Sequence, residues 1–243
     1  MSKKMNILLL LLVSGILGAV ITFAHGLDSW ENHLQYGPDR LHGKVDVKNS
    51  PYYVKLDVYN LTSNNDLTVI PHFATRQQKT NYSCGPCAAA MVVFNKTGKD
   101  LHSEKEIAKI METSTTKGTT LSGMVKYFKE IGWQVRSTLD STTPKDYGGF
   151  LKFVKTNLSN NVPIIVENVD WGGHWRVIIG YDTMGSKETG DDVLIMADPF
   201  DTTDHCQDGY NIVPAERFFY MWFDAKLYKE GERDKLWLTA VPK

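Results

Sequence analysis

The chain has 243 residues, enough for one domain with extensions, and 42% of them are hydrophobic while 23% are charged. Its 27 basic and 28 acidic residues give a formal net charge of −1. That balance argues against proteins that bind through a strongly basic surface, so we expect neither nucleic acid nor an anionic membrane surface as a partner.

The first 24 residues have the pattern of an export signal. Lys3 and Lys4 precede an apolar run, Ile7 to Ala24, that contains no acidic residue. Thr22-Phe23-Ala24 is an imperfect cleavage site, and the run of about 18 residues is also long enough to span a bilayer. Residues 1–24 are therefore predicted to be either a signal peptide or an amino-terminal membrane anchor. In both cases the remainder is extracytoplasmic, either secreted or tethered to the outer face of the cell membrane.

Downstream of this run, the pattern predicts a linker or amino-terminal extension over 25–65 and one main domain over 66–243. We expect a strand at Tyr53–Tyr59, in the extension. In the domain, caps and periodicity predict helices at Cys84–Gly98, from Ser103, after Thr120, at about Asp146–Leu158 and at Pro214–Phe223. Strands are predicted at Trp133–Val135, Val162–Val166, Trp175–Tyr181, Val193–Ala197 and Leu236–Val241. Helices followed by an antiparallel sheet indicate an α+β fold.

The segment Cys84-Gly85-Pro86-Cys87 allows two interpretations. Its spacing is that of a dithiol redox centre, but a cysteine opening an apolar helix is also typical of a nucleophilic thiol. A redox centre needs a hydrophobic strand that delivers the first cysteine to the helix, whereas residues 75–83 are polar and no parallel βαβ pattern surrounds them. A thiol-disulfide oxidoreductase that uses Cys84 and Cys87 is therefore the weaker alternative.

The remaining cysteine chemistry is also open. Cys84, Cys87, His205 and Cys206 could supply zinc ligands, but an adjacent His-Cys pair is geometrically awkward, and we expect neither a metal nor a cofactor. Cys87 either packs as a small hydrophobe or forms a disulfide with Cys206, which export would permit. Each outcome leaves Cys84 as the reactive thiol.

Four residues supply the parts of a cysteine peptidase site. Cys84 lies at a helix start, where unpaired N–H groups and the helix dipole stabilise a thiolate. His174 follows two glycines and precedes a strand, and Asp198 ends the next strand, so antiparallel pairing would bring the carboxylate to the imidazole. Gln78 is placed to donate an N–H to the oxyanion together with the Cys84 backbone, although Gln77 is equally suitable by composition.

The ordered set Gln78…Cys84-Gly85-Pro86, Gly173-His174-Trp175 and Ala197-Asp198-Pro199 resembles the papain-like bacteriocin-processing peptidases, which cut leader peptides after a Gly-Gly pair. The resemblance covers about residues 66–223. It implies a papain-like α+β fold with Gln78 as oxyanion donor, Cys84 as nucleophile, His174 as base and Asp198 as the residue that orients the base. Because an export signal and no transporter accompany these motifs, we expect a stand-alone exported cysteine peptidase that acts on a peptide or protein substrate.

Two other outcomes are compatible with the same residues. If an amine or a thiol replaces water as acceptor, the enzyme is an acyl transferase. If the cleft only binds, the chain is a non-catalytic peptide-binding domain of the same fold. The sequence predicts no oligomeric state.

Overall fold

A computed structural model of the chain describes residues 56–202, 207–225 and 233–243, all of which lie in one compact unit, Gly37–Lys243. Its helices are α2 (Cys84–Thr97), α3 (Glu104–Ile110), α4 (Leu121–Glu130), α5 (Tyr147–Ser159) and α6 (Ala215–Tyr220), with short 3₁₀ helices η2 (Val58–Asn60) and η3 (Asp170–Gly172). The strands are β1 (Leu67–Val69), β2 (Gln134–Ser137), β3 (Ile164–Asn168), β4 (His174–Asp182), β5 (Val193–Ala197), β6 (Tyr210–Pro214) and β7 (Trp237–Val241).

The seven strands form one sheet in which every pairing is antiparallel. Their order is β2-β7-β3-β4-β5-β6, and β1 pairs with β4 outside this path. The predicted α+β fold, with a helix carrying the nucleophile position packed on an antiparallel sheet, is confirmed. This architecture brings two segments far apart in the sequence, the start of α2 and the start of β4, into one region.

Local signals explain why the predicted helices form. Gly98 ends α2 in a left-handed conformation with φ of 67°, which glycine adopts without steric cost. Ser103 forms a complete capping box before α3. Thr120 and Asp146 accept backbone N–H groups at the starts of α4 and α5. The helix predictions at these positions are confirmed.

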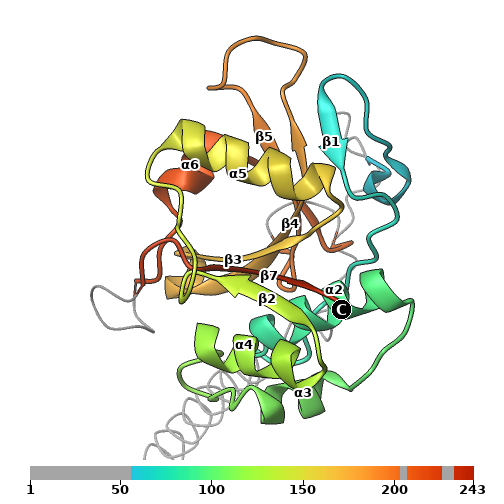
Figure 1. Cartoon of the computed structure of the whole chain (residues 1–243), viewed down its shortest axis with the longest axis vertical. Helices are drawn as coiled ribbons and strands as arrows, with labels where there is room; N and C mark the ends of the chain where they lie inside the picture. The colour runs from blue at the N-terminus through green and yellow to red at the C-terminus, as the bar shows by residue number, and fades with distance from the viewer. Residues whose placement is uncertain (1–55, 203–206, 226–232) are drawn as a thin grey trace, which may run out of the picture. The chain divides into compact units, whose positions relative to one another are not determined.

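Strand β4 is the centre of the sheet and leads directly into the candidate site. Strand β3 pairs along its first half, β1 continues along the same edge, and β5 occupies the other edge. Helix α2 contacts β4 and α5 contacts it too, and Figure 1 shows α2, α3 and α4 gathered on one side of the sheet with α5 on the other. Because both faces are covered, all residues of β4 except Asp182 are buried.

Two sequence expectations differ from the structure. The strand expected at Tyr53–Tyr59 is wrong where it is described, because Val58–Asn60 form η2 and the Asp57 side chain accepts the backbone N–H of Asn60 to close that turn. Strands β1 and β6 were not predicted, since neither short segment has a clear hydrophobic alternation; they form through pairing with β4 and β5. Val58 packs in the same core as the domain.

The export prediction concerns residues 1–24, which lie outside the described residues. Within 56–202, 207–225 and 233–243, no helix has the length and hydrophobicity that a membrane crossing needs.

Candidate active site

Cys84 is the first residue of α2, and the loop before it is held by α3. The Ser83 hydroxyl lies 2.6 Å from Oε1 of Glu104, and the same oxygen accepts the backbone N–H of Lys79 at 2.9 Å. Gly85 allows close approach on the other side, because a Cβ there would lie 2.6 Å from Cβ of Thr119. The thiol is therefore presented from a backbone that is fixed from two directions.

The Cys84 thiol is buried, with 8% of the residue exposed. Burial raises its pKa to about 12, although backbone hydrogen bonds from Trp175 and Gly85 act in the opposite direction. The negative charge of Asp198 raises this pKa further, as does that of Glu167 whenever its carboxyl is ionised. The resting thiol is thus neutral near pH 7, unlike the thiolate that a helix start favours by itself, because burial outweighs the backbone donors.

The structure brings His174 and Asp198 into direct contact. Nε2 of His174 lies 2.7 Å from Oδ1 of Asp198, and both side chains are buried. The same carboxylate oxygen accepts the backbone N–H of Phe200 at 2.8 Å. The register explains the contact: Val177 of β4 pairs with Ala197 of β5, so Asp198 emerges beside the first residues of β4.

Asp198 is ionised despite its burial. Burial by itself would raise its pKa, but the charge and hydrogen bond of His174, the charge of Arg176 and the Phe200 N–H together lower it to about 2. The carboxylate can therefore accept from Nε2–H, which leaves Nδ1 of a neutral His174 as the nitrogen able to take a proton.

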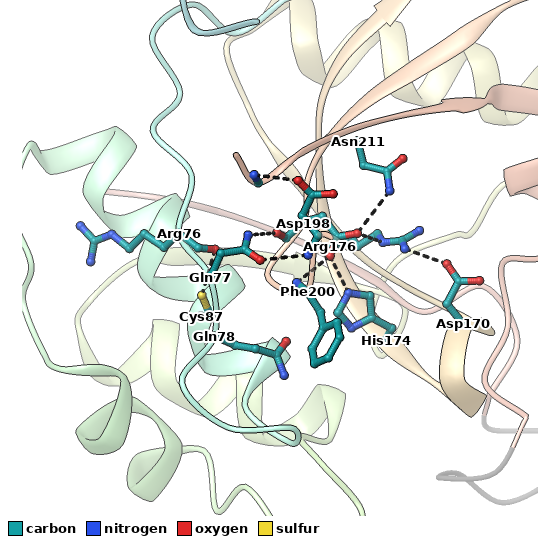
Figure 2. Close-up of polar contacts among 12 residues, drawn as sticks. Arg76, Gln77, Gln78, Cys87, Asp170, His174, Arg176, Asp198, Phe200 and Asn211 are labelled. Carbon is teal, nitrogen blue, oxygen red and sulfur yellow. Dashed lines mark hydrogen bonds and ion pairs between the residues drawn. The ribbon is translucent and has the colours of Figure 1, made fainter. Parts of the chain in front are cut away.

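Sequence reasoning missed Arg176 and Asp170. Arg176 is only 2% exposed, with Nε 2.7 Å from Oδ2 of Asp198 and Nη2 2.7 Å from Oδ2 of Asp170 (Figure 2). Neither pair has the angles of a hydrogen bond, so we describe both as ion pairs. The signal was present in the sequence: a single arginine inside an otherwise apolar strand, two residues after His174 and hence on the same side of the strand.

Aromatic rings cover His174. Trp171 has a φ of 55°, and its ring lies edge-on to the His174 ring with centroids 5.0 Å apart. Its other neighbour is Phe200, also at 5.0 Å. Trp171 itself is 57% exposed. It therefore lies at the protein surface directly beside the imidazole.

The two neighbouring glutamines have different surroundings. The Gln77 amide donates to the carbonyl of Asp198 at 3.0 Å and accepts the backbone N–H of Asp201 at 3.1 Å (Figure 2), so it holds the loop that follows β5. The buried Gln78 amide donates to the carbonyl of Thr80 at 2.6 Å, and its own oxygen has no hydrogen-bond partner. Each amide nitrogen therefore donates one N–H to a backbone carbonyl and keeps the other, and the two glutamines differ in that only the Gln77 oxygen is also bound.

Cys87 lies inside α2 and is 1% exposed, with its sulfur 3.5 Å from the carbonyl of Arg76. Cys84 and Cys87 are both free thiols. His205 and Cys206 are outside the described residues. The predicted alternatives that use them, the disulfide between Cys87 and Cys206 and the zinc site, therefore stay predictions. In the part of the chain that is described, no group of three or more His, Cys, Asp or Glu side chains could hold a metal ion.

A second pair of acids lies in this region. Glu167 of β3 is buried, and burial, the charge of Asp224 and a hydrogen bond with Asp224 keep its pKa well above the usual range. All three effects favour the protonated form of Glu167 over its carboxylate. A carboxylate there would oppose thiolate formation at Cys84, and protonation of Glu167 removes that opposition.

Comparison with known proteins identifies one family and several solved structures. The model of the Peptidase_C39 like family matches residues 70–225. The crystal structure of the peptidase domain of Streptococcus ComA, a bi-functional ABC transporter involved in a quorum sensing pathway, shows 21% identity and a TM-score of 0.47, covering 71% of this chain and 100% of that one. The peptidase domain of Streptococcus mutans ComA shows 18% identity and a TM-score of 0.41, covering 70% and 100% of the two chains. No curated protein matches.

Proposed function

Since this chain belongs to the Peptidase_C39 like family, we propose that it is a cysteine peptidase that hydrolyses peptide bonds through Cys84, His174 and Asp198. The observation that carries the proposal is the buried contact of 2.7 Å between His174 and Asp198, made through Nε2. It leaves Nδ1 as the basic nitrogen. The Cys84 thiol meanwhile accepts the backbone N–H of Trp175, the residue next to His174.

The proposed reaction begins with a neutral pair. His174 Nδ1 takes the proton of the Cys84 thiol as the sulfur attacks the substrate carbonyl carbon, and the Asp198 carboxylate stabilises the resulting imidazolium. His174 then gives that proton to the leaving amine, which releases the first product and leaves a thioester. Water, deprotonated by His174, releases the acid and restores the thiol. An amine or thiol acceptor in place of water would make the same site an acyl transferase.

Two donors are proposed to stabilise the oxyanion. One is the backbone N–H of Cys84, at the first position of α2, where no intrahelical acceptor exists. The other is the Gln78 amide, whose second N–H is not committed to Thr80. Gln77 fits this role less well, because the nitrogen and the oxygen of its amide are both bound to the loop after β5, which fixes its orientation.

Alanine substitution is expected to affect catalysis at one of the two glutamines and stability at the other. Gln78→Ala should lower kcat by about 10²–10³-fold, since one oxyanion donor is lost. Gln77→Ala should instead lower the free energy of unfolding by roughly 1–3 kcal/mol, because two buried backbone groups lose their partner. Steady-state kinetics and urea denaturation of both variants measure this. If Gln78→Ala retains the kcat of the parent enzyme, Gln78 is not an oxyanion donor.

A thiol-reactive peptide probe tests the proposed function. Burial raises the pKa of the Cys84 thiol to about 12, so this thiol is mainly protonated at pH 7 without help. Labelling of Cys84 at that pH therefore needs a base, and His174→Ala is expected to slow it at least 10²-fold, with labelling returning only at strongly alkaline pH. Mass mapping locates the label. If Cys84 is inert near neutral pH in the parent protein, the chain is a binding domain instead.

We also propose that the peptidase acts outside the cytoplasm on a peptide or protein substrate. The basic residues and apolar run of residues 1–24 support export, and the family supports a peptide substrate. The oxidoreductase alternative is less favoured, because it gives no role to the buried contact between His174 and Asp198. Cell fractionation with amino-terminal sequencing tests the location and shows whether the signal is removed.

A further inference from the structure

We propose that Arg176 and Asp170 are positioning residues that extend the site into a row of alternating charges, Asp170, Arg176, Asp198 and His174. In this row Arg176 orients the carboxylate of Asp198 toward His174. Asp170 partly neutralises the Arg176 charge and so weakens its electrostatic repulsion of a protonated His174. The inference rests on the proposed function, in which His174 is the base.

The two oxygens of the Asp198 carboxylate have different partners. Oδ2 faces Nε of Arg176 at 2.7 Å, so Oδ1 is the oxygen that accepts from His174 and from the backbone of Phe200. Figure 2 shows the four side chains in sequence, with Arg176 between the two acids. Arg176 and the amide of Asn211, which donates to Oδ2 at 3.5 Å, together keep Oδ1 directed at Nε2 of His174, and Nδ1 has no bond to Asp198.

The electrostatics explain why two residues are needed. A buried carboxylate without a counter-charge is strongly unfavourable, and the guanidinium of Arg176 offsets that cost. The same positive charge would disfavour the imidazolium that the proposed reaction forms on His174. Asp170, whose side chain is 29% exposed, lies at the far end of the guanidinium and reduces this effect.

The site is sheltered, so these charges act strongly. The Trp171 ring lies beside the His174 ring and 6.0 Å from the guanidinium carbon of Arg176. Arg176 is itself almost fully buried. Interactions between charges that are shielded from water and salt are much larger than those at an exposed surface.

Other titratable groups near His174 come from three neighbouring elements. Cys84 lies at the start of α2, Asp198 follows β5, and Glu167 of β3 lies against Asp224. Cys84 and Asp198 belong to the proposed triad, and burial and the charge of Asp224 raise the pKa of Glu167. Arg176 and Asp170 are therefore the charges that can be altered without removing a proposed catalytic group.

The test is an NMR titration of the His174 imidazole in the full chain, with parent, Arg176→Met and Asp170→Asn proteins. Without Arg176 the field of Asp198 is unopposed, so the midpoint should rise by about one pH unit. Without Asp170 the Arg176 charge is unopposed, so the midpoint should fall, by a smaller amount. Opposite shifts support the inference. Unchanged midpoints, or shifts of the same sign, overturn it, because a purely structural role would not move them in opposite directions.

Two controls accompany the titration. Arg176→Lys preserves the positive charge, so the His174 midpoint should stay close to that of the parent. If Arg176→Met does not fold, Asp170→Asn, at a partly exposed position, is sufficient by itself: an unchanged or raised His174 midpoint in that variant overturns the inference. Labelling of Cys84 is measured in parallel. Inert Cys84 with opposite His174 shifts would refute the peptidase proposal only, whereas labelled Cys84 with unchanged midpoints would refute the positioning role only.

Discussion

Replacing Cys84 with alanine is expected to abolish peptide hydrolysis while leaving the fold intact. The variant removes the proposed nucleophile, and losses of roughly 10³-fold or more in kcat follow when a nucleophile that works with a base is deleted. The site around it should persist, because the contact between His174 and Asp198 does not involve the sulfur. Cleavage of a peptide library, followed by mass spectrometry, measures the loss, and circular dichroism verifies the fold.

Cys87→Ala is the matched control for this prediction. Cys87 lies in the same helix and is also a free, buried thiol, but its sulfur is directed to the carbonyl of Arg76. Its loss should cost about 1 kcal/mol of stability and spare hydrolysis. A redox centre would need both sulfurs, so equal loss of function in the two variants would contradict the peptidase proposal.

Gly123→Ala is expected to destabilise the domain by about 3 kcal/mol. Gly123 lies in the first turn of α4, and a Cβ there would overlap the backbone carbonyl oxygen of Met111 at the end of α3. A backbone atom cannot move aside as a flexible side chain can, so the two helices would have to separate. The same region carries Thr119, which packs against Gly85 and accepts the Trp175 indole N–H at 2.9 Å. Urea denaturation measures the loss.

Gly148→Ala is the control, because Gly148 is also helical but exposed. A Cβ there would make only an ordinary contact, 3.7 Å from Oδ1 of Asp146. Alanine is expected to stabilise the protein by up to about 1 kcal/mol through its higher helix propensity. Stability of Gly123→Ala within about 0.5 kcal/mol of the parent would show that α3 and α4 do not depend on this close approach.

The sequence alone predicted the elements whose signals are local. A glycine at the end of α2, a serine capping box before α3 and a threonine before α4 each act on backbone groups within a few residues, so they could be recognised without a structure. The meeting of His174 and Asp198 was also predictable, because consecutive antiparallel strands are usually neighbours. Strands β1 and β6 were missed since nothing local distinguishes these short segments from loops.

Only the tertiary structure decided how the site residues are partnered. Gln77 and Gln78 are identical in chemistry and adjacent in sequence, and they differ only because the loop after β5 reaches Gln77. The neutral state of the Cys84 thiol follows from its burial, and the role of Arg176 follows from Asp170 and Asp198 lying on either side of it. Burial and ion pairing depend on contacts between distant segments, so the order of residues determined which groups are present and the packing determined their charge.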